Sequence, residues 1–402
     1  MEEESCILVI SALDLWSMGR KRGAQSLWMT LKGYADRGWQ VYFITGNRAQ
    51  GNPPSLPNNV HVVRFDALWL KRLIQIRKLG FFFKIVWWSW FQSMAFINAQ
   101  RIHAKHKFDV VYGYEIHGVP VANALSKLWH VPVVSRFQGT ILGEWMKRRG
   151  WRLRAWDHIL ALKVRTDLVI MANDGTQGDR VLHRLGVNRE RTRFWMNGID
   201  WELFASLPEK AGARCQLRIN AQRVLLTVSR LESWKRIERS IQALPDVVKY
   251  YPDTVFVIVG NGSERERLEC LAHELGVAQH VRFEGAVPHD EVPKYLAAAD
   301  IFLSFYDWSN VGNPLLEAMM AGKCIVTLNN GDTSRFVKNE QNGVLLEYED
   351  LPKLPEVIKR LLADEGHRKR LGASARRFAE KHFWSWEERM DAEVQAVEAL
   401  LS

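Results

Sequence analysis

The chain has 402 residues, 47% of them hydrophobic and 25% charged, a balance typical of a soluble globular protein long enough for two domains. Its four cysteines lie far apart, which favours reduced thiols over a disulfide framework or a metal site. The amino terminus MEEESCILVISAL opens acidic, so we expect no secretion signal. Residues 1–205 hold 29 Lys and Arg against 16 Asp and Glu, a net charge of +13, and this one-sided excess predicts an anionic partner.

The first half of the chain alternates apolar runs with helical patterns. The runs predicted to be strands are residues 6–12, 41–45, 60–65, 110–114, 131–137 and 167–173. They are short and rich in β-branched residues, and helical patterns separate several of them. Continuous apolar strands spaced by helices are typical of a parallel sheet that is covered on both faces.

The same pattern repeats in the second half. Its predicted strands are residues 223–231, 254–260, 281–285, 300–305 and 323–328, with helices near 235–250, 263–276, 289–299 and 314–322. We therefore predict an α/β protein with two doubly wound domains. The predicted boundaries are an N-terminal domain at 1–204, a linker at 205–222, a second domain at 223–380, and a C-terminal helix at 381–402. Such sheets bind ligands beyond the carboxyl ends of their strands, at the switch in strand order.

The segment SNVGNPLLEAMMAG, residues 309–322, follows one of these strands. Pro314 suits the first turn of a helix, so the turn formed by Gly312 and Asn313 presents free backbone N–H groups at a helix N-terminus. Such a terminus is a ready anion site. Glu317 lies near that end, where its carboxylate either caps the helix or accepts hydrogen bonds from a ribose diol, and spacing alone favours the cap.

Here the sequence resembles the retaining glycosyltransferases of family four, glycosyl transferases group 1, which have the GT-B fold of two Rossmann-like domains facing across a cleft. The resemblance also implies that the C-terminal helix at 381–402 returns to the N-terminal domain. Their motif has two glutamates separated by seven residues, and the matching positions here are Gly312, Glu317, Ala318, Gly322 and Val326. By this resemblance Glu317 binds the nucleotide ribose. The first glutamate, which helps to hold the donor sugar in the family, is replaced by Ser309. Asp307 is a candidate for the missing carboxylate.

Other marks of this family follow in order. Arg230 and Lys235 resemble the pair that contacts the donor diphosphate, where cations stabilise the charge that develops on the leaving group. Two flanking glycines of the family are replaced, by Ser229 and Arg236. The resemblance implies that Arg230, Lys235 and Glu317 are catalytic. It assigns donor binding to Gly260, Gly262, Val287, Ser309, Asn310, Gly312, Asn313, Leu316 and Glu317.

The N-terminal half resembles the family more loosely, as expected for a half that binds a variable acceptor. Gly19 and Gly23 flank a basic loop that precedes a helix. Such a loop can bind an anion or a sugar, and a basic solvent-exposed turn fits the same residues equally well. Gln138 stands where the family has a histidine near the donor sugar, and a glutamine cannot carry a proton. His117 is a candidate acceptor contact, although a single histidine is more often structural.

Two stretches combine basic and aromatic residues: 68–102 and 145–156. The first is too charged and its apolar run too short for a membrane-spanning helix, whereas Lys and Arg beside Trp and Phe suit a segment that lies in a membrane interface. The alternative is that the aromatic residues are core and the cations solvated. The stretches therefore leave an anionic membrane surface and an ordinary folded core both open.

The resemblance implies a cytoplasmic enzyme, peripheral on the inner face of the membrane, that acts in cell-surface polysaccharide or glycolipid synthesis. It would move a sugar from a UDP- or GDP-linked donor to a glycan or polyprenyl-linked acceptor, with retention of configuration. No Asp-x-Asp element follows a strand, so we expect no metal and no further cofactor. The alternative is a degenerate, non-catalytic GT-B protein that binds nucleotide or glycan and supports a partner. Nucleic acid is not expected, because no helix-turn-helix or zinc module is visible.

Overall fold

The computed structural model describes residues 4–13, 25–46, 56–67, 74 and 79–401, and the chain forms two compact units. The first unit comprises Met1–Asn173, Gln177–Asn197 and Trp386–Ser402, and the second comprises Asp174–Thr176 and Gly198–Ser385. The chain thus returns to the first unit at residue 386, five residues after the boundary that the sequence predicts.

The first unit is built on a seven-stranded parallel sheet with the order β3-β2-β1-β4-β5-β6-β7. The strands are β1 (Cys6–Ser11), β2 (Gln40–Thr45), β3 (Val60–Arg64), β4 (Val110–Tyr114), β5 (Val133–Phe137), β6 (Leu168–Ala172) and β7 (Thr192–Trp195). The helices are α1 (Gln25–Asp36), α3 (Gly80–His103), α4 (Glu115–Trp129), α5 (Leu142–Trp145), α6 (Trp151–Arg154), α7 (Trp156–Lys163), α8 (Gly178–Arg184) and α18 (Trp386–Glu398). The sequence predicts the first six strands but not β7, whose four residues are all only partly buried.

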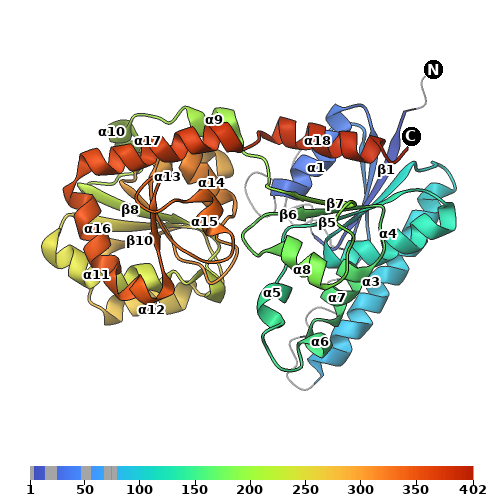
Figure 1. The fold of residues 1–402 in the computed structure, drawn as a ribbon, viewed down its shortest axis with the longest axis horizontal. Coiled ribbons are helices and arrows are strands. Elements are labelled where there is room, and N and C mark those ends of the chain that lie inside the picture. Colours follow the sequence, from blue (N-terminus) through green and yellow to red (C-terminus); the bar gives the residue numbers. More distant parts are fainter. Residues whose placement is uncertain (1–3, 14–24, 47–55, 68–73, 75–78, 402) are drawn as a thin grey trace. The chain divides into compact units, whose positions relative to one another are not determined.

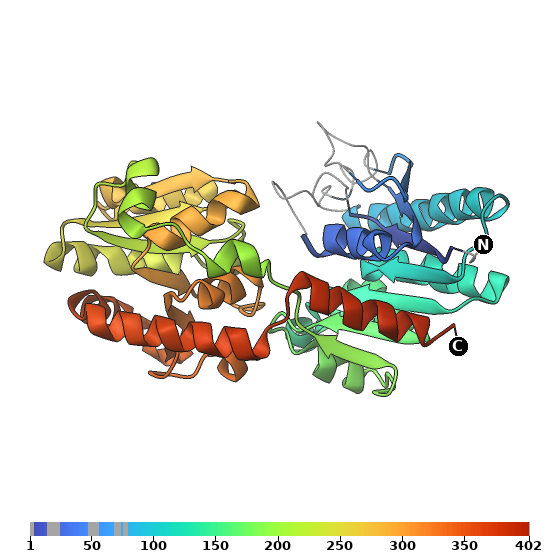
Figure 2. The same ribbon diagram turned by 90° about the horizontal axis from the view of Figure 1, so that it is seen from above.

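Helices cover both faces of the first sheet (Figure 1), and α3, α4 and α7 lie on one of them. The other face carries α1 and α18 side by side, as Figure 2 also shows. Their contact is close, because a Cβ on Gly33 of α1 would lie 2.6 Å from Met390 Cγ of α18. Cover on both faces explains why the strands of this sheet read as continuous apolar runs.

A buried ionic cluster fixes α18 to the first sheet. Arg136 on β5 and Arg389 on α18 each lie 2.9 Å from the carboxylate of Glu393. Tyr112 donates a hydrogen bond to the same carboxylate at 2.6 Å. Burial opposes ionisation of Glu393, but the two arginines outweigh it and lower the pKa of this carboxyl. Buried charges are tolerated when they are paired and hydrogen-bonded in this way, so the cluster commits the C-terminal helix to the first unit.

The second unit is built on a six-stranded parallel sheet with the order β10-β9-β8-β11-β12-β13. The strands are β8 (Arg223–Val228), β9 (Thr254–Val259), β10 (Val281–Gly285), β11 (Ile301–Ser304), β12 (Cys324–Leu328) and β13 (Val344–Leu346). The helices are α9 (Trp201–Ala205), α10 (Lys210–Gln216), α11 (Glu238–Tyr250), α12 (Arg265–Glu274), α13 (Val292–Ala298), α14 (Asn313–Met320), α15 (Thr333–Phe336), α16 (Leu354–Ala363) and α17 (Glu365–His382). The sequence predicts the first five strands but not β13, which has three residues.

Residues 205–222, predicted to be a linker, belong to the second unit and contain α10. Lys210 and Arg214 of this helix both pair with Asp300, and the Arg214 contact measures 2.8 Å. The same carboxylate accepts a hydrogen bond from the backbone N–H of Val224, the second residue of β8, at 2.7 Å. The sequence pattern does not reveal this helix, because ion pairs, rather than an apolar stripe, hold it to the sheet.

Candidate functional site

The order of the second sheet reverses between β8 and β11, and the segments that follow these two strands form the candidate site. The ladder between them contains only the pairs Leu225–Ile301 and Leu226–Phe302, although each strand continues for two more residues. In sheets of this kind, the crevice beyond the carboxyl ends at such a reversal is where ligands bind. Most of the predicted donor residues lie in these two segments.

Two cations lie in the segment after β8. Arg230 is exposed, whereas Lys235 is 8% exposed and its Nζ lies 3.7 Å from the centroid of the Tyr306 ring and 4.0 Å from that of Trp234. Burial and the neighbouring Arg230 lower the pKa of Lys235 well below its ordinary value of 10.5, while Asp174 opposes the lowering. Within the described part of the chain, no carboxylate lies within ion-pairing distance of either cation. The aromatic faces offset only part of the free-energy cost of burying the ammonium, so a bound anion would be favourable next to it.

Asp307, the candidate for the missing family carboxylate, already forms ion pairs with two arginines. Its Oδ1 lies 2.6 Å from Nη2 of Arg239, and its Oδ2 lies 3.0 Å from Nε of Arg236. Arg236 has a φ of +53°, the left-handed region that favours the glycine found here in the family. Its ion pairs with Asp307 and Glu238 hold it in that conformation. Asp307 therefore ties the segment after β11 to the segment after β8.

A buried amide orders the segment after β11. Asn310 is 0% exposed, and its Oδ1 accepts hydrogen bonds from Ser304 Oγ at 3.3 Å and from the Tyr306 N–H at 3.2 Å. Its Nδ2 donates to Asn330 Oδ1 at 2.9 Å and to the Leu328 carbonyl at 3.3 Å. These contacts stabilise the conformation of the loop, so the side chain of this predicted donor residue has a structural role.

The helix α14 starts as the sequence predicts. Gly312 is its N-cap, Asn313 is its first residue, and Pro314 lies in its first turn. Leu316 is 1% exposed, so its side chain packs in the interior and its backbone is the part near the helix start. The backbone N–H groups of this first turn lie on the same edge of the sheet as Arg230.

Glu317 contacts a histidine that the sequence patterns do not single out. Its Oε1 lies 2.8 Å from Nε2 of His289, and both side chains are largely buried. The His289 ring packs edge-on against buried Phe204, with centroids 5.4 Å apart. Among the described contacts, the Glu317 carboxylate bonds to His289 and not to the first N–H groups of α14, which disfavours the capping role. Val287, the predicted contact of the base, is partly exposed in the loop just before His289.

The Gly-x-Gly element after β9 packs against the segment that carries Arg230. A Cβ on Gly260, whose φ is +140°, would lie 1.7 Å from the Ser229 carbonyl oxygen. A Cβ on Gly262 would lie 2.3 Å from the Leu231 carbonyl oxygen. These glycines therefore allow two loops of the protein to approach each other, which positions the backbone on both sides of Arg230.

The predicted acceptor residues lie in the first unit. Gln138 follows β5, and its amide donates to Tyr114 OH at 2.6 Å and accepts from Asn197 Nδ2 at 3.1 Å. His117 lies in α4 and packs edge-on against buried Trp87 of α3, with centroids 4.7 Å apart. Gly19 and Gly23 lie outside the described residues. Gln138 is thus part of a polar network at the carboxyl end of the first sheet, and His117 is part of a helix contact.

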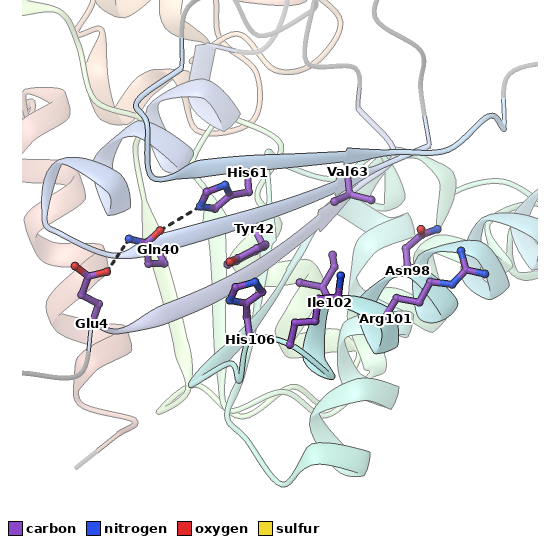
Figure 3. Close-up of a pocket in the computed structure, with 10 residues that line it drawn as sticks. Glu4, Gln40, Tyr42, His61, Val63, Asn98, Arg101, Ile102 and His106 are labelled. Carbon is purple, nitrogen blue, oxygen red and sulfur yellow. Dashed lines mark hydrogen bonds between the residues drawn. The ribbon is translucent and has the colours of Figure 1, made fainter.

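A separate open pocket of about 700 Å³ lies in the first unit (Figure 3). Tyr42 of β2 forms its floor, between the rings of His61 and His106 at centroid distances of 4.7 and 5.1 Å. Gln40 at its rim donates to Glu4 and contacts His61. Gln40 begins β2, so the pocket lies toward the amino ends of the strands. Ligand sites of doubly wound sheets lie at the opposite edge, so the pocket is not part of the candidate site.

Sequence reasoning also missed Asp174. Ser309 Oγ donates a hydrogen bond of 2.8 Å to Asp174 Oδ2, across 135 residues of sequence. The only local signal is an Asp-Gly pair after a strand, which indicates a turn and no more. His289 likewise carries no signal, because a lone histidine in a loop is compatible with many roles.

Both halves of the chain match known families. Residues 213–378 match the family described as "Glycosyl transferases group 1", and residues 23–198 match the "Glycosyl transferase 4-like domain". A GDP-mannose-dependent alpha-(1-6)-phosphatidylinositol monomannoside mannosyltransferase of Mycolicibacterium smegmatis is 30% identical over 200 residues, 48% of this chain and 52% of the relative. An uncharacterized glycosyltransferase of Methanocaldococcus jannaschii is 25% identical over 302 residues, 74% of this chain and 77% of the relative. The chain spans about half the length of the curated relatives it matches first.

Solved structures share the whole architecture. A sucrose-phosphate synthase from Thermosynechococcus elongatus superposes with a TM-score of 0.79 at 21% identity, over 99% of each chain. The Anabaena protein HepE, solved in complex with UDP and glucose, superposes with a TM-score of 0.74 at 21% identity, over 98% of this chain and 100% of HepE. These similarities show the GT-B fold. The two family matches, which between them span most of the sequence, show that the chain belongs to the glycosyl transferases group 1.

Proposed function

We propose that this protein is a retaining glycosyltransferase that moves a sugar from a UDP- or GDP-linked donor to a glycan or lipid-linked acceptor. The observation that carries the proposal is the buried Lys235 ammonium, which lies with Arg230 at the β8–β11 reversal without a carboxylate partner among the described residues. A diphosphate would supply the missing negative charge. The name of the mycobacterial relative includes GDP-mannose, and HepE was solved with UDP, which supports a donor of this class.

Each donor residue then has a physical role. Arg230 and Lys235 bind the diphosphate and stabilise the charge that develops on it as the glycosidic bond breaks. The first turn of α14 adds backbone donors to the same anion. Glu317, held by His289 at 2.8 Å, accepts hydrogen bonds from the ribose hydroxyls, and the main chain near Val287 meets the base.

The proposed retention is compatible with a glutamine at position 138. Gln138 cannot carry a proton, and its amide is already bonded to Tyr114 and Asn197. We propose that a phosphate oxygen of the leaving group takes the proton from the acceptor hydroxyl, which then attacks the face of the sugar that the diphosphate leaves. This step needs no protein base and no metal ion. Gln138 and His117 remain candidates for contact with the acceptor.

A panel of nucleotide sugars tests the donor class. Ligands that bind the folded state raise its apparent stability, so we expect UDP- or GDP-sugars to raise the unfolding temperature of the full chain. Release of nucleoside diphosphate in the presence of glycan and polyprenyl-linked acceptors then tests turnover. Stabilisation without turnover on any acceptor would favour the non-catalytic alternative, and no stabilisation by any nucleotide would contradict the proposal.

We also propose that one end of the first unit docks on an anionic membrane surface, at the inner face. None of the described helices is long and apolar enough to cross a bilayer. Trp87 and Phe91 of α3 are core, but Phe81 and Phe82 at its start are 50% and 59% exposed. Leu153 of α6 is 71% exposed, among the exposed cations Lys147, Arg148, Arg149, Arg152 and Arg154. Contacts between α3 and the start of α7, which directly follows α6, bring both groups to the same end. Exposed aromatic residues beside cations suit the lipid interface.

Flotation with anionic vesicles tests this surface. We expect the protein to float with the vesicles at low salt and to be released by high salt, because the attraction is partly electrostatic. The double variant Arg148→Glu, Arg149→Glu should float much less. The matched control Arg377→Glu, Lys381→Glu changes two exposed cations of α17 and should float like the wild type. A wild-type chain that stays with the soluble fraction at low salt would contradict the proposal.

A further inference from the structure

The segment Asp174–Thr176 follows β6 but belongs to the second unit. The Val311 N–H donates to the Asp174 carbonyl at 3.0 Å. Gly175 has a φ of +92°, and a Cβ there would lie 3.1 Å from Val311 N. A Cβ on Gly331 would lie 1.8 Å from the Gly175 carbonyl oxygen. Three backbone segments therefore pack tightly here, and this packing fixes the position of Asp174.

Three hydrogen bonds hold the Asp174 carboxylate. Ser309 Oγ donates to Oδ2 at 2.8 Å, and the N–H and hydroxyl of Thr176 donate to Oδ1 at 3.1 and 2.6 Å. An ionised carboxylate has about four acceptor positions, so one remains after these three bonds. Ser309 has a φ of +57°, a conformation that a residue with a side chain adopts rarely, and its hydroxyl meets Asp174 from that conformation.

Asp174 and Lys235 influence each other without forming an ion pair. Burial raises the pKa of Asp174, whereas its bonds to Thr176 and Ser309 and the charge on Lys235 act to lower it. In turn Asp174 counteracts the lowering of the Lys235 pKa. Among the described residues, ion pairs have N–O distances of up to 4.0 Å, and Asp174 and Lys235 do not form one of them. A molecule that bridges the two groups must offer a hydroxyl to the carboxylate and an anion to the ammonium, which is the chemistry of a sugar joined to a phosphate.

We propose that Asp174 accepts hydrogen bonds from the hydroxyls of the donor sugar while Lys235 binds the diphosphate, and that Ser309 is the positioning residue that orients Asp174. The inference rests on the proposed function, because it places the sugar next to the diphosphate. It also explains Ser309, since a short hydroxyl leaves space for a carboxylate from another segment. An acidic sugar would bring a second carboxylate next to Asp174, so the geometry favours a neutral sugar.

Calorimetric titration with UDP, UDP-glucose, GDP and GDP-mannose tests the assignment on the full chain. For Asp174→Asn we expect the affinity for the preferred nucleoside diphosphate to stay within about twofold, and that for its sugar conjugate to fall about 10-fold or more, as for a lost hydrogen bond to a charged group. Ser309→Ala should lower the affinity for the sugar conjugate by about three- to 10-fold. Ser309→Asn should restore it, because asparagine tolerates the left-handed conformation and can donate to Asp174.

The control is Asp253→Asn, which makes the same change on a half-exposed residue just before β9 and should bind all four probes like the wild type. The unfolding temperature without ligand shows whether each variant folds. If Asp174→Asn does not fold, the affinities of the two Ser309 variants test the proposal instead. Equal losses for the diphosphate and its sugar conjugate, or no loss for either, would overturn the role of Asp174 and leave the proposed function standing. A wild-type chain that binds none of the four probes would overturn both.

Discussion

Two buried cations, one in each unit, have opposite surroundings. Arg136 is 0% exposed and lies 2.9 Å from Glu393, which outweighs the effect of burial and raises the pKa of the guanidinium. Lys235 is 8% exposed, meets the ring faces of Trp234 and Tyr306, and has its pKa lowered by burial. A buried charge with an ionic partner contributes to the fold, whereas one without a partner gains from a bound anion. The difference separates a structural cluster from a candidate binding site.

Removing the partner of the structural cation should have the largest effect on stability. Glu393→Gln leaves Arg136 and Arg389 buried without a carboxylate, and we expect a loss of about 3–5 kcal/mol in the free energy of unfolding of the first unit. Urea unfolding measures it. Glu387→Gln, an exposed change in the same helix, is the control and should stay within about 0.5 kcal/mol of the wild type. A Glu393→Gln chain as stable as this control would mean that the cluster does not fix α18.

The matching change in the second unit should affect turnover more than stability. For Lys235→Met we expect turnover at limiting donor to fall about 10²–10³-fold, because a cation next to the leaving diphosphate is lost. The free energy of unfolding should change far less, rising by on the order of 1 kcal/mol at neutral pH, since a buried amine without an ionic partner is replaced by an apolar chain of similar length. Lys249→Met, on the exposed side of α11, is the control. Near-wild-type turnover of Lys235→Met would contradict the diphosphate site.

Removing the proposed ribose contact should have a smaller effect, on nucleotide affinity. Glu317→Ala removes a carboxylate that His289 orients, and we expect nucleotide affinity to fall about 10-fold, as for a lost charge-assisted hydrogen bond. Titration with UDP and GDP measures the loss, and the exposed Glu266→Ala is the control. Donor use by Glu317→Ala that equals the wild type at limiting donor would remove this residue from the site.

The smallest effect concerns the pH dependence of stability. The pKa of Lys235 in the folded chain is below its ordinary value of 10.5, so between the two values the unfolded chain binds more protons and stability rises with pH. The lowered pKa of buried Lys235 therefore costs stability at pH values below 10.5, and the cost disappears as the pH rises past 10.5. We expect Lys235→Met to exceed the wild type in the free energy of unfolding by on the order of 1 kcal/mol at neutral pH. That advantage should shrink toward alkaline pH, and a constant difference would count against the lowered pKa.

The fold was largely predictable because buried parallel strands leave continuous apolar runs. Of the thirteen strands among the described residues, eleven follow from this signal, whereas β7 and β13 are too short to show it. Helix α10 was also hidden, because its contact with Asp300 is ionic. The return of the C-terminal helix was predicted from family resemblance, and its physical cause, the pairing of Glu393 with Arg136, joins residues 257 positions apart.

The candidate site was predictable only where its residues follow one another along the chain. Arg230, Lys235 and Glu317 are in the order of the family motif, and the structure places them after β8 and β11 at the same reversal. Asp174 was missed because its contact with Ser309 depends on how a segment that follows β6 packs in the second unit. Asp307, the nearer candidate in sequence, turned out to be neutralised by two arginines.

Proton uptake on nucleotide binding tests the role of Lys235 most directly. Calorimetric titration with UDP and GDP, in buffers of different ionisation enthalpy from about pH 7 to about pH 10, counts the protons bound with the ligand. A diphosphate beside Lys235 should raise its lowered pKa, so the wild type should take up protons at pH values between the lowered and the raised pKa, and Lys235→Met should not. Equal proton uptake by the wild type and Lys235→Met, with unchanged affinity, would contradict a diphosphate site at this lysine.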